Sequence, residues 1–423
     1  MAAEVSHEVA IRATDPERIG QALAAASGQT RFPQTLRREG YGIASGDAGL
    51  AVLCAAYDRE EPDAGWDRAG HGFLTTAARS AERAHVLPPA LFGGLSGLAF
   101  AAHGLNREGQ RYARLLATLD AALARDVVRL TASVDEEDPV PMGHFDVISG
   151  LSGIVAYLLC RDEHRMLPRA LRSLTRLAEP LPGLPRWFTP VELVGDEVAR
   201  ARYPYGNLNC GLAHGIPGPL AALALALAAG HEVKGQGAAV RSLAAWLADQ
   251  RTEDAWGVDW PGAISVSKAG LPEPSAATAG RAGWCYGGPG VARALWHAGQ
   301  ALDDGYLRGL ALDGVLAAVR RPVEIRGIPS PTLCHGVAGL LQIVLRFLHD
   351  TGHPELSFAA DALMAQLLTL HDPDRPLGYA ALEPGPNPVD RGGLLDGAAG
   401  VSLALLAATS RDEPSWDRLF LLS

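Results

Sequence analysis

A sevenfold repeat of paired glycines is the feature of this sequence that most constrains its fold. Each copy reads Gly-x-x-Gly and is followed directly by a run of apolar residues. Neighbouring copies are 48 to 72 residues apart, so each interval has room for two helices. Repeats of this size are typical of folds built from stacked supersecondary units. The leading glycines are Gly46, Gly94, Gly150, Gly215, Gly287, Gly336 and Gly397.

The apolar runs differ from the stretches between them. Residues 220–229 are hydrophobic all round, whereas residues 111–130 show the 3.6-residue period of an amphipathic helix. We therefore predict an all-α fold with inner and outer helices, an α/α toroid of about seven of each, as a single domain over residues 1–423. An open solenoid is the alternative, but the irregular intervals favour closure.

Two segments rich in proline and glycine, residues 181–206 and 256–274, interrupt the helical periodicity. We expect small strand-bearing insertions or peptide-guiding flaps there, with the insertion around 181–206 as the main candidate.

Composition narrows the class of protein. With 48% hydrophobic residues the chain is not disordered, and 37 basic against 47 acidic residues, a net charge of −10, disfavours nucleic acid as a partner. The N-terminus lacks the apolar core of a signal peptide, and residues 220–229 are about half the length of a membrane span. Five cysteines spread along the chain do not look like a disulfide framework, so we expect a cytoplasmic location.

The repeat register indicates where the chemistry lies. In a closed ring, equivalent positions converge at one end of the axis. Two of the five cysteines, Cys285 and Cys334, occupy the same position, two residues before a leading glycine, and His335 follows the second. We therefore expect these three side chains to be neighbours.

Two thiolates and an imidazole suit zinc, and three protein ligands leave its fourth position open, as in catalytic sites. One Zn2+ per chain, held by Cys285, Cys334 and His335, is the prediction. Inert buried thiols are the plainer alternative. A structural zinc would need a fourth ligand, for which Cys210 is the nearest candidate.

Four further residues fall at the same end of the ring: Asp146, His214, Arg281 and Tyr286. A histidine held by a carboxylate can exchange a proton near pH 7, and an arginine can stabilise an oxyanion or enolate. Each also has an ordinary structural role open to it, such as a helix cap for Asp146.

Two acidic features receive structural interpretations. Asp396 stands directly before a leading glycine, and we expect a helix cap there. The acidic run at residues 135–138 precedes a proline and is expected to form a solvated loop rather than a magnesium site.

Three motifs carry a resemblance to a known family: GLAHGIPG (211–218), GWCYGGPG (283–290) and LCHGVAG (333–339). With the seven glycine repeats they resemble the lanthionine synthetase C-like family, the lanthipeptide cyclases, over essentially the whole chain. The resemblance implies an α/α toroid, a zinc bound by Cys285, Cys334 and His335, and an active site lined by the positions matching the four residues named above.

The reaction that the resemblance implies is cyclisation of a ribosomally made precursor peptide containing dehydroalanine or dehydrobutyrine. A peptide cysteine thiolate, activated by zinc, adds to the alkene β-carbon, and the resulting enolate is protonated. We assign His214 as proton donor, oriented by Asp146, with Arg281 steadying the enolate.

Because no dehydratase segment precedes the repeats, the resemblance is to the stand-alone cyclase of a two-enzyme pathway. The expected partners are the dehydrated precursor peptide, a separate dehydratase and a transient membrane-associated biosynthetic complex.

Three other functions stay open from the sequence. Eukaryotic relatives bind glutathione and act on other modified substrates, so thiol addition for repair is one. Zinc-dependent prenyl transfer is a second, although its Asp-Cys-His ligand set does not match the second cysteine here. A non-catalytic scaffold with structural zinc is the third.

Overall fold

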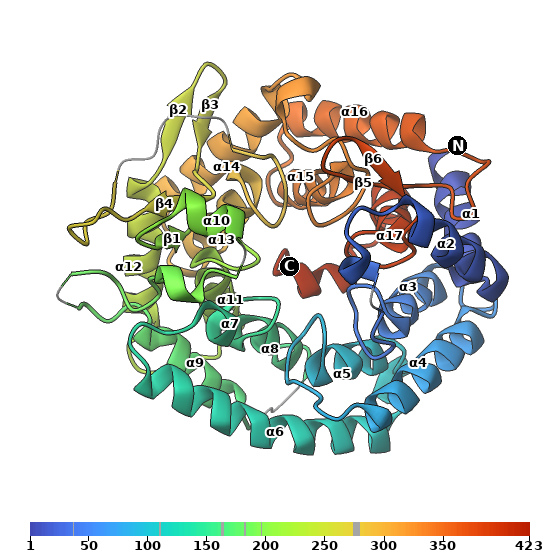
Figure 1. Cartoon of the computed structure of the whole chain (residues 1–423), viewed down its shortest axis with the longest axis horizontal. Coiled ribbons are helices and arrows are strands. Elements are labelled where there is room, and N and C mark those ends of the chain that lie inside the picture. Colours follow the sequence, from blue (N-terminus) through green and yellow to red (C-terminus); the bar gives the residue numbers. More distant parts are fainter. Residues whose placement is uncertain (37, 110, 162–164, 182, 196, 274–279) are drawn as a thin grey trace. The chain divides into compact units, whose positions relative to one another are not determined.

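The computed structural model describes residues 1–36, 38–109, 111–161, 165–181, 183–195, 197–273 and 280–423. Its contacts divide the chain into two compact units. The first unit comprises Met1–Ala122 and Ile328–Asp417, and the second comprises Leu123–Gly327 and Arg418–Ser423. Each is built mainly of helices, as the sequence predicts (Figure 1).

The first unit contains the following elements in chain order. They are α1 (Ala2–Thr14), α2 (Pro16–Gln29), η1 (Pro33–Leu36), α3 (Asp47–Glu60), α4 (Trp66–Arg83), α5 (Leu95–Gly104), η2 (Arg107–Gly109), the start of α6 (Ala113–Glu136), α15 (Val337–Thr351), α16 (Pro354–Leu370), β5 (Ala381–Glu383), β6 (Asn387–Val389), α17 (Ala398–Thr409) and the start of η5 (Trp416–Phe420). Strands β5 and β6 form an antiparallel hairpin in which Leu382 faces Pro388.

The second unit contains the rest of α6 and η5. Its other elements are α7 (Met142–Phe145), α8 (Leu151–Leu158), α9 (Leu167–Arg176), η3 (Val191–Leu193), α10 (Glu197–Arg202), β1 (Asn207–Asn209), α11 (Pro217–Ala228), α12 (Gln236–Asp249), β2 (Thr252–Asp254), β3 (Gly257–Asp259), β4 (Ala263–Ser265), α13 (Gly288–Ala301), α14 (Gly305–Arg320) and η4 (Val323–Ile325). Strand β1 pairs antiparallel with β4, and β2 pairs antiparallel with β3.

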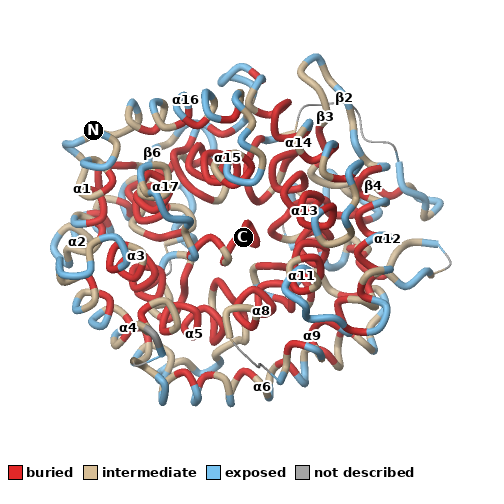
Figure 2. Tube along the Cα trace, turned by 180° about the vertical axis from the view of Figure 1, so that it is seen from behind, coloured by how far each residue is buried: buried red, intermediate tan, exposed pale blue. Residues whose placement is uncertain are grey.

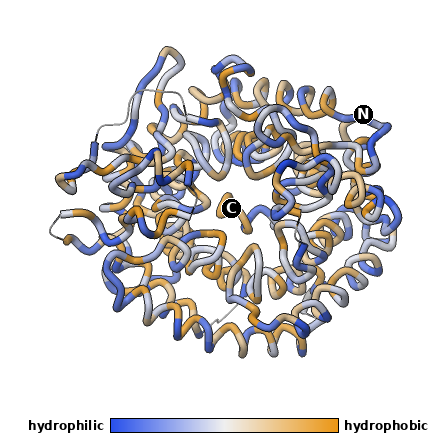
Figure 3. The backbone as a smooth tube through the Cα atoms, in the orientation of Figure 1, coloured by the Kyte–Doolittle hydropathy of each residue, from blue (hydrophilic) through white to orange (hydrophobic). Residues whose placement is uncertain are grey.

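Helices that begin at a glycine motif are buried along most of their length, and the helices packed against them are not. In the first unit, α15 is buried almost continuously from Val337 to Phe347, whereas α16 buries Leu356, Ala360, Leu363 and Leu367. Those four lie on one face at helical spacing. Figure 2 shows the contrast in the burial of the two helices, and Figure 3 shows apolar and polar residues alternating along α16. In the second unit, α13 and α14 repeat the pattern.

Close backbone contacts explain the paired glycines. A side chain on either glycine would overlap the carbonyl group of the residue six positions earlier in the loop. A Cβ on Gly339 would meet the oxygen of Leu333, and one on Gly290 would meet that of Trp284. Gly287 adds a second reason, because its φ of +123° is a conformation that other residues resist. The motif therefore folds the loop tightly over the start of its own helix.

The two Pro/Gly-rich segments contain little regular structure. The first holds η3 and α10, and strand β1 begins directly after it. The second contains β3 and β4, so strands lie within the second segment, whereas the described part of the first contains no named strand. Residues 182, 196 and 274 lie outside the described residues.

The acidic run at 135–138 was predicted to be a loop, which is wrong for its first half. Asp135 and Glu136 form the last residues of α6, and Arg176 donates a hydrogen bond to the Asp135 carbonyl at 2.6 Å. Across the described residues, no helix combines the length and apolarity that crossing a membrane requires.

Candidate metal and active site

The loops that precede the buried helices are joined by backbone hydrogen bonds at one repeat position. In the first unit, the amide of Cys334 donates to the carbonyl of Leu395 at 3.0 Å, and Leu395 donates to Ala44 at 3.0 Å. Ala44 in turn donates to Phe92 at 3.2 Å. All four stand two residues before a leading glycine. Equivalent positions of the sequence repeat are therefore joined by backbone hydrogen bonds from one loop to the next.

The second unit has a similar row, in which Val147 stands three residues before its leading glycine and the other two members stand two residues before theirs. The Val147 amide donates to the Ala213 carbonyl at 3.0 Å, and the Ala213 amide donates to the Cys285 carbonyl at 3.3 Å. These bonds hold three loops side by side. The residues next to them in sequence include Asp146, His214 and Tyr286.

Asp146 and His214 form a carboxylate–imidazole pair, with 2.6 Å between Asp146 Oδ2 and His214 Nδ1. The Asp146 side chain is almost fully buried, and that of His214 is 35% exposed. The other carboxylate oxygen accepts hydrogen bonds from the amides of Ser149 (2.7 Å) and Gly150 (2.9 Å). Asp146 therefore holds both the imidazole and the loop that leads into α8, whose start receives no side-chain cap.

Tyr286 lies beside this pair. Its ring centroid is 6.4 Å from that of His214, and Asn209 Nδ2 donates to its hydroxyl oxygen at 3.0 Å. Burial raises the pKa of Tyr286 above its ordinary value, so the phenol keeps its proton at neutral pH. Asn209 is a contributor that sequence reasoning missed. Its Oδ1 accepts from the Gly211 amide at 2.9 Å, a local turn that the Asn-x-Gly spacing could have suggested.

Arg281 and Cys285 occupy one loop in the second unit. The Arg281 side chain is exposed and makes no hydrogen bond or ion pair with the described residues, whereas Cys285 is buried. The loop is anchored at Trp284, whose indole Nε1 donates to the Phe420 carbonyl at 2.9 Å, and at Ala282, whose amide donates to Arg326 at 2.8 Å. These two fixed points, which lie between Arg281 and Cys285, restrict the loop while leaving the guanidinium exposed.

His335 and Asp396 face each other in the first unit, with 3.6 Å between His335 Nδ1 and Asp396 Oδ1. The expected helix cap at Asp396 is wrong, because the start of α17 at Gly397 receives no side-chain cap. Among the described residues the buried Oδ1 atom has no hydrogen-bond partner. Burial raises the pKa of Asp396, and the neighbouring His335 and Arg391 act against that rise. The Asp396 carboxylate thus lies opposite the His335 imidazole and does not cap the backbone of α17.

The second unit presents Cys285, and the first presents Cys334 and His335. Two sulfurs and one imidazole nitrogen make up a donor set that could hold a metal ion, and in the described part of the chain this set has three members. No disulfide bond joins the described cysteines. Burial raises the pKa of Cys210 to about 12, and its Sγ lies 3.6 Å from the Leu208 carbonyl oxygen. Cys210 is therefore a protonated, buried thiol.

Known proteins resemble this chain both in sequence and in fold. A family model described as lanthionine synthetase C-like protein matches residues 38–421. The nisin biosynthesis protein NisC of Lactococcus lactis subsp. lactis is 28% identical over 269 residues, which is 62% of this chain and 63% of the relative. The solved structure of a nisin cyclase matches with a TM-score of 0.79 at 22% identity, covering 96% of this chain and 97% of that one. The predicted fold class, an α/α toroid, is confirmed by this likeness.

Proposed function

The chain belongs to the lanthionine synthetase C-like family, and from this we propose that it is a zinc-dependent lanthipeptide cyclase. Its reaction is the addition of a peptide cysteine thiol to dehydroalanine or dehydrobutyrine, which forms a lanthionine or methyllanthionine ring. The observation that carries the proposal is the Asp146–His214 pair, whose carboxylate is buried and whose imidazole is partly exposed, in the same row of loops as Cys285. A carboxylate-oriented imidazole is a proton-transfer device, and thiol addition to an alkene needs one proton delivered to carbon.

We assign one zinc ion to Cys285, Cys334 and His335. The donor set fits, because thiolates and imidazole are the ligands that zinc prefers, and three of them leave one position open. Asp396 stands where it would fix the ring of His335 through Nδ1 and leave Nε2 for the metal, a common arrangement around ligating histidines. When bound, zinc would supply a position for the peptide sulfur and favour its thiolate at neutral pH.

His214 would deliver the proton. Because Nδ1 faces the Asp146 carboxylate, the proton available to a substrate is the one on Nε2. As the S–C bond forms at the β-carbon, the electron pair of the alkene moves into an enolate, and His214 protonates its α-carbon. The thiol proton goes to solvent and later restores the imidazolium, so the product has the same mass as the substrate.

Arg281 and Tyr286 would complete the site. The exposed guanidinium of Arg281 has no competing acid among the described residues, so it is available to the enolate oxygen. Tyr286 keeps its hydroxyl proton, and Asn209 supplies a hydrogen bond to the phenol oxygen, which leaves the O–H free to donate toward the substrate.

The biological setting follows from the reaction. We propose that both units belong to one cyclase domain over residues 1–423, acting in the cytoplasm, where the ligand thiols stay reduced. The substrate would be a precursor peptide dehydrated by a separate dehydratase, and the two enzymes would meet in a transient membrane-associated complex.

A thiol count tests the proposal directly. The full chain is incubated with a synthetic peptide containing one dehydroalanine and one cysteine. Cyclisation by itself leaves the peptide mass unchanged, so the remaining thiols are alkylated and the mass of the alkylated peptide is then measured. The peptide should lose its alkylation site with wild type and keep it with His214→Asn, which should retain zinc. Unchanged thiol loss in that variant removes His214 from the mechanism. A peptide that keeps its alkylation site and gains the mass of glutathione, when glutathione is added, supports the repair function instead.

A further inference from the structure

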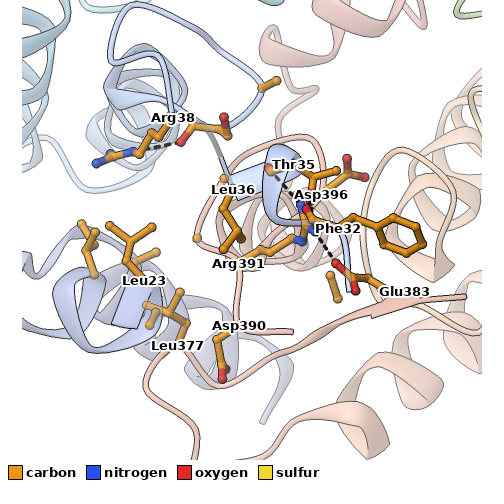
Figure 4. Close-up of a pocket in the computed structure, with 18 of the residues that line it drawn as sticks. Leu23, Phe32, Thr35, Leu36, Arg38, Leu377, Glu383, Asp390, Arg391 and Asp396 are labelled. Carbon is orange, nitrogen blue, oxygen red and sulfur yellow. Dashed lines mark hydrogen bonds and ion pairs between the residues drawn. The ribbon is translucent and has the colours of Figure 1, made fainter. Parts of the chain in front are cut away.

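A cavity of about 410 Å³ opens in the first unit and is lined in part by side chains of α2 (Figure 4). Its volume lies at the lower end of the ~300–1,000 Å³ typical of small-ligand sites. In the view of Figure 4, Leu23, Leu36 and Leu377 gather on one side of Arg391, and Phe32 and Asp396 lie on the other. Leu23 and Phe32 are among the exposed large apolar residues of the chain, at 41% and 36%. The cavity therefore presents apolar side chains to solvent.

Most charged groups in the cavity wall already have a partner of opposite charge. Arg391, which forms an ion pair with Glu383, donates a further hydrogen bond to Thr35 Oγ1 at 2.7 Å, so its guanidinium is fixed in the cavity wall. A free charge on a ligand would therefore find little uncompensated charge to bind in this part of the cavity, and an apolar group would gain by leaving water. The ion pairs are Arg38–Asp47, Arg391–Glu383 and Arg375–Asp390, with nearest N···O distances of 2.6, 2.7 and 3.2 Å.

The cavity is continuous with the candidate metal ligands of the same unit, because His335 and Asp396 are part of its wall. A peptide whose cysteine sulfur is held beside His335 must place its adjacent residues within a few ångströms of that ligand. The apolar wall formed by Leu23, Leu36 and Leu377 is the surface that such residues would meet.

We propose that this cavity is a specificity pocket for an uncharged apolar side chain of the substrate peptide, on a residue next to the reacting cysteine. This inference rests on the proposed function for the identity of the occupant. It predicts that the chain selects peptides by the residue beside the cysteine, with leucine preferred over alanine and aspartate rejected.

The test measures binding without turnover. Short synthetic peptides carry one cysteine, an alanine in place of the dehydro residue, and leucine, alanine or aspartate on each side of the cysteine. Their Kd values are measured by calorimetry with the full chain as purified. The leucine peptide should bind on the order of tenfold more tightly than the alanine peptide, with the aspartate peptide weakest. Equal affinities would overturn the proposal.

A matched pair of variants locates the preference. Leu23→Glu places a charge at the cavity, and Phe358→Glu places one on the outer face of α16, where the phenyl ring is 75% exposed. Both positions tolerate a polar side chain because both are exposed. Leu23→Glu should abolish the leucine preference while Phe358→Glu retains it; a preference that survives Leu23→Glu contradicts the assignment.

The reactive forms of the same peptides separate the two proposals. Wild-type cyclisation of both peptides by Phe358→Glu, with a slowing by Leu23→Glu that is larger for the leucine peptide than for the alanine peptide, supports a pocket that selects the side chain beside the cysteine. Cyclisation of all peptides with no binding preference leaves the cyclase proposal standing and overturns the pocket. Binding preference without any cyclisation supports the pocket and sinks the cyclase proposal.

Discussion

Asp146→Asn should separate the two jobs of a single carboxylate. Oδ1 accepts the amides of Ser149 and Gly150, and Oδ2 faces His214 at 2.6 Å. An asparagine can keep its carbonyl oxygen on the amides, which preserves these two hydrogen bonds. Its amide nitrogen then faces Nδ1 and removes the negative charge that stabilises a charged imidazole.

The magnitudes differ for the two jobs. Asp146→Asn keeps an acceptor for the two loop amides, so its free energy of unfolding should stay within about 1 kcal/mol of wild type, whereas Asp146→Ala leaves both amides without that acceptor and should lose about 1–3 kcal/mol. Loss of an oriented proton donor costs about 10²–10⁴-fold in rate. We therefore expect Asp146→Asn to fold, to retain zinc and to cyclise peptide at least 100-fold more slowly.

Urea unfolding and the thiol count measure the two effects on the same samples. Asp58→Asn is the control, since Asp58 is a buried carboxylate bound by Arg107 Nε at 2.8 Å, and its loss should lower stability without a comparable loss of turnover. The double variant Asp146→Asn/His214→Asn should be no slower than His214→Asn alone, because the two residues act as one unit. Wild-type turnover in Asp146→Asn, or losses that multiply in the double variant, would refute the reasoning.

Three further outcomes are expected. Cys210→Ser should keep its full zinc content by elemental analysis, because the wild-type thiol is buried and protonated at neutral pH; loss of metal would favour a closed structural site. Gly290→Ala should lower the urea-measured free energy of unfolding by about 1–3 kcal/mol, since its methyl group would overlap the Trp284 carbonyl, while Gly305→Ala, with open space at its Cβ, should not destabilise. Burial alone would raise the pKa of Glu383, but hydrogen bonds to its carboxylate hold the pKa at about 2. Because the folded pKa is depressed, the stability that this group contributes is full above about pH 4.5 and is lost as the pH falls toward 2. Glu383→Gln should therefore make the free energy of unfolding depend less on pH across that window.

The repeat register was readable from sequence because it has a simple physical cause. A glycine is needed wherever a loop carbonyl lies against the start of its own helix, as Gly339 and Gly290 show. The same loops then form rows of backbone hydrogen bonds, so equal position in the sequence means adjacency in each unit. This is why His214 and Tyr286, each one residue before a leading glycine, could be grouped without coordinates.

Other features could not be predicted from the sequence, because they depend on the direction of a side chain or on segments that are distant in the chain. Asn209 follows its own turn signal, but nothing local says that its amide reaches Tyr286. Asp396 stands at a position that suits a cap, and only the fold shows it facing His335. The apolar cavity joins α2 to residues more than 350 positions later, such as Leu377, so no periodicity could reveal it.

The central claim is that a zinc held by Cys285, Cys334 and His335 keeps one position for the substrate's sulfur. Zinc K-edge absorption of the purified chain, before and after adding a cysteine peptide without a dehydro residue, measures this directly. We expect two sulfur neighbours at about 2.3 Å without peptide and three with it. Four protein ligands that do not change on addition of peptide, or an absence of bound zinc, would contradict it.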